Sequence, residues 1–600
     1  MRFAKLCPVL VCAGSLFAQQ PPQSPVIPPQ QDSIVVTGTY QPVPLSESDR
    51  VVQVFHVDQD SILFDSFSDY LRQDSSVDLQ QRAPDTVQSD ISIRGGTYGQ
   101  TLVLLNGIRI NDAQSAHHNM DLPVPLEAIS EIQILNGSGS SQYGSDAVGG
   151  VVNLITRVSE TPEVRLRTAL GNWGRNEEAG SIAGGTKTIS EELAFSREFS
   201  SGFEPDRDYR VLSLASITHA KTVLGNTDVL LSLSDRPFGA DQFYGNFNSW
   251  ERTKGWFASI RQDLGANTDL EFAFRRHTDL FVLLRNDPEY FTNRHALESW
   301  EGAARHTDNL PGHARLHYGI EAFSDSIVSN NLGNHSRVYE AGYVSYDLFA
   351  LRRFSFSAGV RDEIYGSLNS QLSPVMSGGA WLSPNWKLRA SVSRAFRLPD
   401  YTDLYYHDPE NVGSPNLKPE RAWNYEGGID WHAGQRLHAS ATAFQRRDYD
   451  LIDYVQNSPT DIFRATNFQN LVFTGVEAMF GYQSRRQNLS VQYTGITGER
   501  AIKPGEISKY VFNYPINNAV VAWQGSFGSQ LAARMRIGVT DRYARDPYGI
   551  WDASVARIRG HVRPFLQITN ITSTVYQEIS GVAMPKFGIL GGVELVARMR

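Results

Sequence analysis

Serine, histidine and acidic residues, which most often carry catalysis, are scattered along this chain of 600 residues without a known catalytic spacing. No serine lies in a nucleophile-elbow sequence, and no histidine lies in a metal-protease motif of the HExxH type. Sequences such as Ser138-Gly139 are better explained as tight turns. We therefore predict that the protein is not an enzyme.

Carboxylates in polar segments could bind a hard cation, because carboxylate and carbonyl oxygens are the ligands that Ca²⁺ prefers. The candidates are Asp206, Asp208, Asp408 and Glu410. Charged loops of this kind are also found simply solvated, and this is the interpretation that we favour. We expect no required cofactor, with calcium as the alternative.

Short runs of β-forming residues occupy the region from Asp90 to Arg157. They are Thr101–Leu105, Ile132–Leu135 and Val151–Ile155, and Asn-Gly, Gly-Gly and Ser-Gly pairs stand between them. Such pairs favour tight turns with positive φ. The region is therefore predicted to form a globular unit of short strands.

From about Glu163 onward, apolar and polar residues alternate along repeated strands. Clear examples are His313–Glu321, Arg353–Arg361 and Leu437–Ala443. Strands of a transmembrane barrel alternate in this way, with the apolar face toward lipid and the polar face toward the lumen. Strands of soluble sandwiches alternate too, so this pattern alone does not separate the two folds.

The connections between the strands do separate them. Short turns, such as Leu264–Asn267 and Ser383–Trp386, alternate with long polar loops. Long loops are predicted at Arg236–Trp250, Leu284–Asn293, Ser324–Ser336, Arg397–Arg421, Tyr449–Asn470 and Thr572–Pro585. Short turns on one side of the membrane and long loops on the other are typical of outer-membrane barrels. Counting strands on this rule gives about 22, the number associated with plugged transporters.

The N-terminus has the features of an export signal. Arg2 and Lys5 precede a short apolar run, Leu6–Phe17, and Ala18 offers a small residue for cleavage, so residues 1–18 are predicted to be a secretory signal peptide. The following segment, Gln19–Gln31, is rich in glutamine and proline and is predicted to be an extended linker.

Composition excludes two classes of protein. The mean hydropathy is −0.32, and the chain contains no apolar run long enough to form a membrane-spanning helix. The net charge of −9 argues against nucleic acid as a partner. Both cysteines, Cys7 and Cys12, lie in the predicted signal peptide, so the mature chain needs no disulfide.

The region Ser92–Arg157 resembles the plug domain of TonB-dependent outer-membrane receptors, which are gated barrels that import scarce nutrients. The resemblance rests on SIRGGTYGQTLVLLNGIRIND (Ser92–Asp112) and SEIQILNGSGSSQYGSDAVGGVVNLITR (Ser130–Arg157). Ser393–Pro399 with Gly413–Glu420 looks like the paired barrel motif of this family. The resemblance implies an all-β transmembrane barrel of about 22 antiparallel strands, residues 163–600, with an N-terminal α+β plug domain, residues 51–157, inside its lumen. It also implies an outer-membrane location with a periplasmic N-terminus.

A β-branched run after the linker, within residues 32–40, resembles the TonB box. Its residues are Asp32, Ser33, Ile34, Val35, Val36 and Thr37. A β-branched run on a flexible tether can add as a strand to the sheet edge of another protein. The implied partners are a TonB-type periplasmic coupling protein, outer-membrane lipid and a small-molecule cargo, and we expect a monomer. The chain ends in Arg600 instead of the aromatic residue usual for barrels, which leaves its assembly signal unidentified.

Two positions in the plug depart from the family pattern. Asn106 replaces an aspartate before one glycine, and Asn136 replaces an arginine before another. Plug arginines of this family are thought to face barrel glutamates, and Arg94, Glu420 and Glu477 match that pattern. Because Asn136 cannot supply a second cation, we expect a weaker ionic lock between plug and barrel.

The resemblance places the cargo-binding residues in two outward loops of the plug and in the long barrel loops. The candidates are Tyr98, Gln100, Gln114, Ser115, His117, His118 and Asn119 in the plug, with Asp241, Tyr244 and His407 in the barrel. Aromatic faces and a few hydrogen-bonding groups are typical of a pocket for a cofactor-sized ligand.

The length, the box-like run and the YGSDAVGGVVNLIT segment look most like the cobalamin (vitamin B12) receptor branch. Cobalamin is nearly neutral, and the loop Arg397–Arg421 leans acidic, which disfavours strongly anionic siderophores. A haem receptor is the main alternative, because His117 or His118 could ligate haem iron from one side and His407 from the other. A ferric-siderophore receptor and, in another class, a passive porin-like channel stay open.

Overall fold

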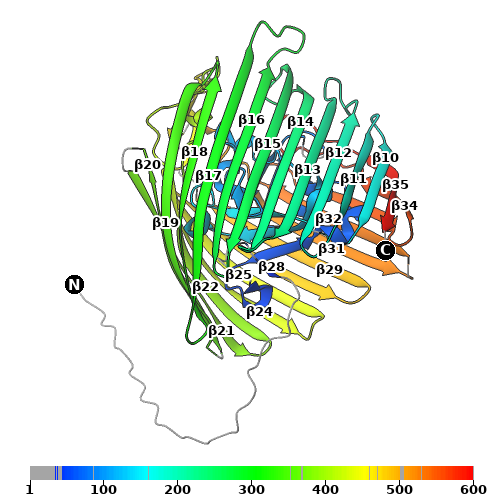
Figure 1. Cartoon of the computed structure of the whole chain (residues 1–600). Helices are drawn as coiled ribbons and strands as arrows, with labels where there is room; N and C mark the ends of the chain where they lie inside the picture. The colour runs from blue at the N-terminus through cyan, green and yellow to red at the C-terminus, as the bar shows by residue number, and fades with distance from the viewer. Residues whose placement is uncertain are drawn as a thin grey trace, which may run out of the picture.

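The computed structural model describes residues 34–35, 37, 43–84, 87–157, 159, 161–351, 353–366, 369–458, 460–468, 470–499, 506–528 and 530–598. Within these residues, 22 antiparallel strands close into a barrel, because the first strand, β10, pairs with the last, β35. Figure 1 shows these two strands side by side, with the blue N-terminal strands inside the barrel wall. The predicted fold class is confirmed. No helix in the described part of the chain is long and apolar enough to cross a membrane.

The barrel strands follow one another around the wall in chain order. They are β10 (Glu163–Gly171), β11 (Asn176–Gly185), β12 (Ile189–Ser200), β13 (Tyr209–Lys221), β14 (Asn226–Asp241), β15 (Asn248–Leu264), β16 (Thr268–Val282), β17 (Thr292–Leu310), β18 (Ala314–Ser329), β19 (Gly333–Leu351), β20 (Phe354–Tyr365), β21 (Asn369–Ser383), β22 (Trp386–Arg397), β24 (Glu420–Ala433), β25 (Leu437–Tyr449), β28 (Leu471–Gln483), β29 (Gln487–Gly498), β31 (Pro515–Phe527), β32 (Leu531–Arg542), β33 (Tyr548–Arg557), β34 (Val562–Thr569) and β35 (Gly588–Arg598).

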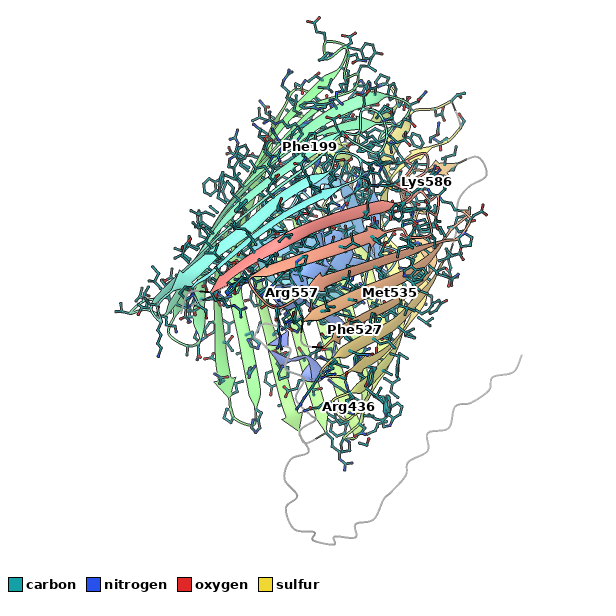
Figure 2. The ribbon with its side chains drawn as sticks, turned by 90° about the vertical axis from the view of Figure 1, so that its right-hand side faces the viewer. Phe199, Arg436, Phe527, Met535, Arg557 and Lys586 are labelled. Carbon is teal, nitrogen blue, oxygen red and sulfur yellow. The ribbon has the colours of Figure 1, made fainter. Side chains whose placement is uncertain are left out.

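Alternation along the strands separates an apolar outer face from a polar inner face. In β14, Ser232, Ser234 and Arg236 are buried toward the lumen, whereas Leu231 points outward and is 52% exposed. A soluble protein would bury such side chains, but lipid covers them in a membrane barrel. Figure 2 shows side chains projecting from the wall, with Arg436 near one rim and Lys586 near the other.

Connections differ in length at the two rims. Turns such as those between β15 and β16 and between β21 and β22 lie at the rim where β10 begins, which we call the turn end. The long connections lie at the opposite rim, which we call the loop end.

Two of the long loops predicted from the sequence are wrong. Most of Arg236–Trp250 and Ser324–Ser336 continues β14, β15, β18 and β19, since the polar residues of these segments still pair as strands.

At the loop end, two long connections fold into additional structure. The connection between β22 and β24 contains α4 (Tyr401–Tyr405) and β23 (Asn411–Val412), and the next one contains β26 (Ile452–Gln456) and β27 (Phe463–Asn467). With β30 (Ile507–Ser508) these strands form a small sheet in the order β23-β27-β26-β30.

The N-terminal unit contains a five-stranded sheet in the order β3-β8-β9-β6-β7. Its strands are β3 (Val52–His56), β8 (Ile129–Asn136), β9 (Gly150–Thr156), β6 (Thr101–Leu105) and β7 (Ile108–Arg109), and a hairpin of β4 (Val77–Gln81) and β5 (Ser89–Ile93) lies beside it. Short helices α1 (Val57–Asp60), α2 (Phe67–Leu71) and α3 (Ser140–Tyr143) and 3₁₀ turns η1 (Leu45–Glu47), η2 (Ser61–Leu63), η3 (Tyr98–Gln100), η4 (Ala116–His118) and η5 (Leu126–Ala128) connect these elements.

The sheet of this unit is apolar on both faces. Val103 and Leu105 belong to one buried cluster, whereas Leu102 and Leu104 belong to another on the opposite face. The turn between β6 and β7 places Asn106 at φ 54° and Gly107 at φ 87°. Asn tolerates this left-handed conformation, so the departure from aspartate leaves the turn intact.

Barrel arginines hold this unit by donating to its backbone and carboxylates. Arg446 donates to the carbonyl oxygens of Arg94 and Gly95, both at 3.2 Å. Arg275 binds Asp112 at 2.9 Å. These contacts replace part of the hydration that the buried guanidinium groups lose inside the lumen.

Candidate functional site

Two short turns of the N-terminal unit, η3 and η4, lie next to each other toward the loop end. Thr97 caps η3, and its backbone N–H donates to Oε1 of Gln100 at 3.2 Å. Gly99 lets η3 approach the buried side chain of Arg397 closely, since a Cβ atom there would lie 2.4 Å from Nε of Arg397. This close approach fixes η3 against the end of β22.

Four rings from the two turns and the loop-end connections form what we call the aromatic platform: Tyr98, His117, Tyr454 and Tyr510. The Tyr98 and His117 rings stack with centroids 4.1 Å apart, and the Tyr510 ring meets both edge-on at 5.2 and 5.5 Å. Tyr454 meets Tyr510 edge-on at 6.3 Å. Tyr98, His117 and Tyr510 are only partly buried, so the platform offers aromatic surface to a ligand.

A chain of charged groups orients His117. Its Nδ1 lies 2.8 Å from Oδ1 of Asp90, and Arg82 binds the other oxygen of Asp90 at 3.1 Å. Burial lowers the pKa of His117 although Asp90 opposes the shift. Burial would raise the pKa of Asp90, but Arg82 and His117 outweigh it and lower that pKa. The ring of His117 is therefore held by the carboxylate of Asp90, which Arg82 holds in turn.

Other predicted plug residues lie deeper and bond to the barrel. Gln100 donates to Glu420 at 2.8 Å, and Gln114 donates to Asp279 at 2.8 Å. Asn119 accepts from the backbone of Asp112, and Ser115 and His118 are also buried. Gln100, Gln114 and His118 thus join the plug to the barrel wall, whereas Asn119 bonds within the plug, to Asp112 and to the carbonyl oxygen of Tyr98.

The predicted barrel residues occupy three separate places. Tyr244 is half-buried and donates to Glu251 at 2.5 Å, while its oxygen accepts from Gln88 of the plug. Asp241 ends β14 and accepts from its neighbour Gln242. His407 is exposed, and its carbonyl accepts from Asn331 in the turn between β18 and β19.

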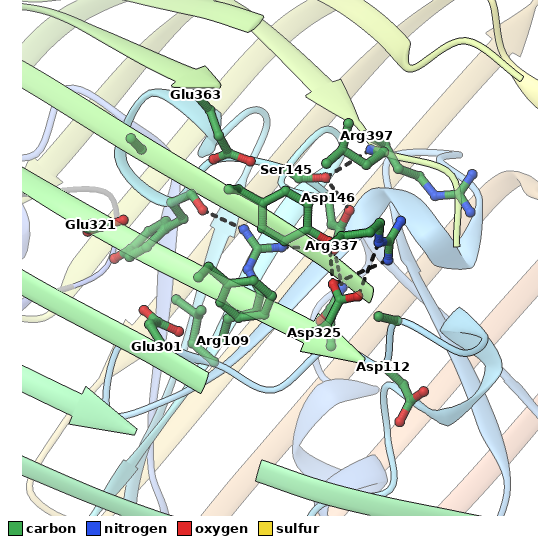
Figure 3. Close-up of a pocket in the computed structure, with 18 of the residues that line it drawn as sticks. Arg109, Asp112, Ser145, Asp146, Glu301, Glu321, Asp325, Arg337, Glu363 and Arg397 are labelled. Atoms are coloured by element: carbon green, nitrogen blue, oxygen red, sulfur yellow. Dashed lines mark hydrogen bonds and ion pairs between the residues drawn. The ribbon is translucent and has the colours of Figure 1, made fainter. Parts of the chain in front are cut away.

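A narrow, partly open pocket with a cavity volume of about 80 Å³ lies between the plug and the inner faces of β17 to β20. Arg109 of the plug and Arg337 of β19 both extend into it (Figure 3). Arg109 binds Asp146 at 2.9 Å, and Arg337 binds Asp325 at 3.1 Å.

Acidic groups outnumber basic groups around this pocket. Its described lining holds eight carboxylates and five arginines. The carboxylates are Asp112, Asp146, Glu301, Glu321, Asp325, Glu340, Glu363 and Asp400, and the arginines are Arg109, Arg305, Arg337, Arg361 and Arg397. In the loop between β22 and β24, burial raises the pKa of Asp400 to about 8.

The carboxylates considered for calcium have partners of their own. Arg285 binds both Asp206, at 3.2 Å, and Asp208, at 2.5 Å. Asp408 accepts from the backbone N–H groups of Glu410 and Asn411, at 2.7 and 2.6 Å. Calcium binding at these positions stays a prediction.

The contact between Arg94 and the barrel is extensive. Arg94 binds Glu477 at 2.6 Å and Glu426 at 2.7 Å, whereas Glu420 instead binds Gln100 and Arg397. Glu426 and Arg50 were missed by sequence reasoning. Arg50 binds Glu426 at 3.2 Å and donates to the carbonyl of Ser138 at 2.7 Å.

Asn136 carries no charge, but Arg50 supplies a second cation to the ion pairs between plug and barrel. The contacts therefore differ from the weaker ionic lock that we expected. Asn136 accepts from Ser76 at 3.0 Å and takes no part in the ion pairs with Glu426. In the sequence, Arg50 stands just before β3. This position does not indicate which residue its side chain contacts.

Part of the predicted TonB box lies within the described residues. Ile34 and Val35 form β1, which pairs with Val43 and Pro44 of β2. Thr37 is buried, donates from its backbone to Gln133 at 3.0 Å and accepts from Asn153 at 3.0 Å. Asp32, Ser33 and Val36 lie outside the described residues, as do the predicted signal peptide, the linker and Arg600.

Comparison with known families covers most of the chain. Residues 172–571 match the family model described as TonB dependent receptor-like, beta-barrel. Residues 44–151 match the TonB-dependent Receptor Plug Domain.

Individual relatives are more distant. The vitamin B12 transporter BtuB of Photobacterium profundum is 26% identical over 437 residues, covering 68% of each chain. The iron-regulated outer membrane virulence protein of Vibrio cholerae is 26% identical over 485 residues, covering 74% of this chain and 72% of its own. The structure of the siderophore receptor PirA from Acinetobacter baumannii matches with a TM-score of 0.76 at 15% identity, over 91% of this chain and 98% of its own. That last likeness establishes the fold alone.

Proposed function

This chain belongs to the family of TonB-dependent outer-membrane receptors, and from that premise we propose that it imports cobalamin or a related corrinoid. In this proposal the loop end faces outward, and cargo binds between the aromatic platform and the long loops. The turn end then faces the periplasm, where the N-terminal segment meets an energy-coupling protein.

The acidic balance of the pocket lining is the observation that carries the choice of cargo. Carboxylates still outnumber arginines in the lining when Asp400 is protonated near neutral pH, and this excess gives the pocket a negative field. A negative field repels strongly anionic chelates and tolerates a nearly neutral corrinoid. Similarity to a vitamin B12 transporter over two thirds of the chain supports the same choice.

The aromatic platform suits a large flat cargo. Tyr98 and His117 stack on each other, and Tyr510 adds an edge-on ring, so the group presents a rigid and mostly apolar surface. Rigid aromatic groups contribute contact area at a low cost in conformational entropy. Hydrogen bonds from neighbouring polar groups would then fix the orientation of the cargo.

Binding of candidate cargoes to the purified receptor tests this proposal. We expect cyanocobalamin to bind, and we expect Tyr98→Ala to weaken binding about 3- to 10-fold, the loss typical of one aromatic contact. The matched control is Tyr318→Ala, since Tyr318 lies exposed on the outer face of β18 and should not affect binding.

Two results would contradict the proposal: a ferric catecholate that binds while cyanocobalamin does not, or haemin with a Soret shift that His117→Ala abolishes.

The haem alternative is supported by one observation of its own. Asp90 holds Nδ1 of His117 at 2.8 Å, as carboxylates commonly do behind a metal-ligating histidine, which leaves Nε2 as the ligating nitrogen.

Energy coupling through the box is the second part of the proposal. Thr37 joins the box to β8 and β9 of the plug, so a pull on this segment would reach the sheet directly. Deleting residues 32–39 should abolish cobalamin uptake by cells and leave cobalamin binding unchanged. Deleting residues 21–28, a piece of the linker of the same length, is the control and should leave uptake intact. Full uptake after the first deletion would refute the coupling role.

A further inference from the structure

Five ionisable side chains meet where the plug touches β15 and β16. The plug contributes His118 and Asp121, and the barrel contributes Glu251, His277 and Asp279. We call this group the His118 cluster. Every member is at least nine-tenths buried; His118 is 5% exposed and His277 is 1% exposed. His277 and Asp279 are two residues apart on β16 and therefore point to the same face of the strand.

Three ligand atoms of the cluster have the spacing of a metal site. Nδ1 of His118 lies 3.4 Å from Oδ2 of Asp121, and Nε2 of His277 lies 3.3 Å from the same oxygen. In a tetrahedral zinc complex with bonds of about 2.0–2.1 Å, ligand atoms are about 3.3 Å apart. The three atoms lie within 4.8 Å of one another, so one ion can reach them all after small movements.

The outer ring nitrogens of both histidines face carboxylates. Nδ1 of His277 lies 2.8 Å from Asp112, and Nε2 of His118 lies 3.6 Å from Asp279. Metal-ligating histidines usually have such a carboxylate behind them, which fixes the tautomer and raises the basicity of the ligating nitrogen. Arg275 binds Asp112 at 2.9 Å and keeps that carboxylate in place.

The nitrogen of His118 that points into the cluster has no well-oriented hydrogen bond among the described residues, although the side chain is almost completely buried. Its nearest partner is Oδ2 of Asp121, 3.4 Å away. A metal ion between the two atoms would replace this poorly oriented contact with a direct bond to each of them.

We propose that His118, Asp121 and His277 bind one divalent transition-metal ion of the zinc class. Two imidazoles and one carboxylate suit Zn²⁺, Co²⁺ or Ni²⁺ better than Ca²⁺, which prefers oxygen ligands. Since two ligands come from the plug and one from β16, the ion links the plug to the barrel wall. It favours the plug-in-place state, because a ligand stabilises the state that binds it.

Metal titration of the full-length receptor, purified without a histidine tag and stripped with a chelator, tests this proposal. We expect one equivalent of Zn²⁺ to bind and Co²⁺ to give the intense visible absorption of a tetrahedral complex. The variants His277→Gln and Asp121→Asn should each weaken binding by at least about 10-fold. The control is His317→Gln, since His317 forms a buried pair with Asp347 elsewhere in the barrel, at 2.9 Å.

Each outcome decides the proposal. A stripped wild-type receptor that binds less than one equivalent overturns it, and this measurement needs no variant to fold. Binding that survives both ligand substitutions, or that His317→Gln abolishes, also overturns it. Loss in the two ligand variants alone, with the tetrahedral Co²⁺ absorption seen in the wild type, supports it. In that case we also expect Zn²⁺ to slow hydrogen exchange in η4, which would locate the ion at the plug.

Discussion

Neighbouring residues of the plug acquire different properties from their surroundings. His117 and His118 are adjacent in the chain, yet burial lowers the pKa of His117, whereas the carboxylates of Asp121 and Asp279 overcome burial and raise the pKa of His118. The first is a half-buried ring beside Tyr98, and the second lies in a group of carboxylates. Residue type alone does not distinguish them.

Asp74 illustrates the same effect for a carboxylate of the plug. Burial raises its pKa to about 6, although Ser76 donates two hydrogen bonds to one of its oxygens, at 2.8 and 2.7 Å. The folded state therefore binds a proton more tightly than the unfolded chain. Its contribution to stability is greatest below about pH 4 and is lost as the pH rises through about 6.

We predict that Asp74→Asn removes this pH dependence and stabilises the plug above pH 6 by up to about 2–3 kcal/mol. Asparagine keeps an acceptor for Ser76 and carries no charge. Hydrogen exchange of the β4–β5 hairpin, corrected for the intrinsic effect of pH, measures the change. Asp58→Asn, at an exposed position of α1, is the control. The prediction is wrong if the variant and the wild type show the same pH dependence.

At the scale of elements, β24 and β28 hold the plug through Glu426 and Glu477. Glu426 binds two arginines from different parts of the plug, Arg50 and Arg94, whereas Glu477 binds Arg94. The removal of one partner from a buried ion pair leaves an uncompensated charge, which typically costs 3–5 kcal/mol. Loss of Glu426 should therefore be more damaging than loss of Glu477.

We predict that Glu426→Gln lowers the free energy for releasing the plug by about 3–5 kcal/mol, and Glu477→Gln by less. The reporter is a cysteine introduced at the buried position Ser92, labelled with a thiol reagent at increasing urea concentration. Glu178→Gln is the matched control, since Glu178 pairs with Arg197 at an exposed position. Equal labelling in Glu426→Gln and in the control would show that the ionic lock does not hold the plug.

For the molecule as a whole, the membrane replaces water around the barrel. Apolar side chains such as Leu231, Ile320 and Phe272 are exposed on the outer face, while the lumen is filled by the plug and by charged groups. The stability of the barrel therefore depends on lipid outside and on plug contacts inside. The longest strands lie in the stretch from β14 to β19, and Figure 1 shows the wall rising highest in this part of the barrel.

We predict that Leu231→Arg destabilises the receptor in bilayers by about 2–4 kcal/mol, because the charge would face lipid. Urea unfolding in liposomes, followed by heat-modifiable mobility on gels, measures this loss. Val223→Arg is the control, since Val223 is fully exposed in the turn between β13 and β14 and should tolerate the charge. Equal stability of the two variants would mean that this face of β14 does not contact lipid.

Local patterns in the sequence were sufficient for the fold class. Alternation with a period of two and the spacing of turn residues are properties of short segments, so they could be counted without knowing which strands pair. The count of strands was predicted in this way, whereas the plug inside the barrel was implied by the resemblance of Ser92–Arg157 to the receptor family. The extent of β14 and β18 was not, because polar residues do not show whether a backbone continues to pair above the membrane.

The candidate site depended on contacts between segments far apart in the chain. Tyr98 and His117 were predicted together from plug motifs, but Tyr454 and Tyr510 come from barrel connections hundreds of residues away. The pairing of Arg50 with Glu426 and the burial of His118 beside His277 likewise required the closed barrel. Barrel closure and the position of the plug decide which inward side chain faces which plug residue, and no local pattern carries that information.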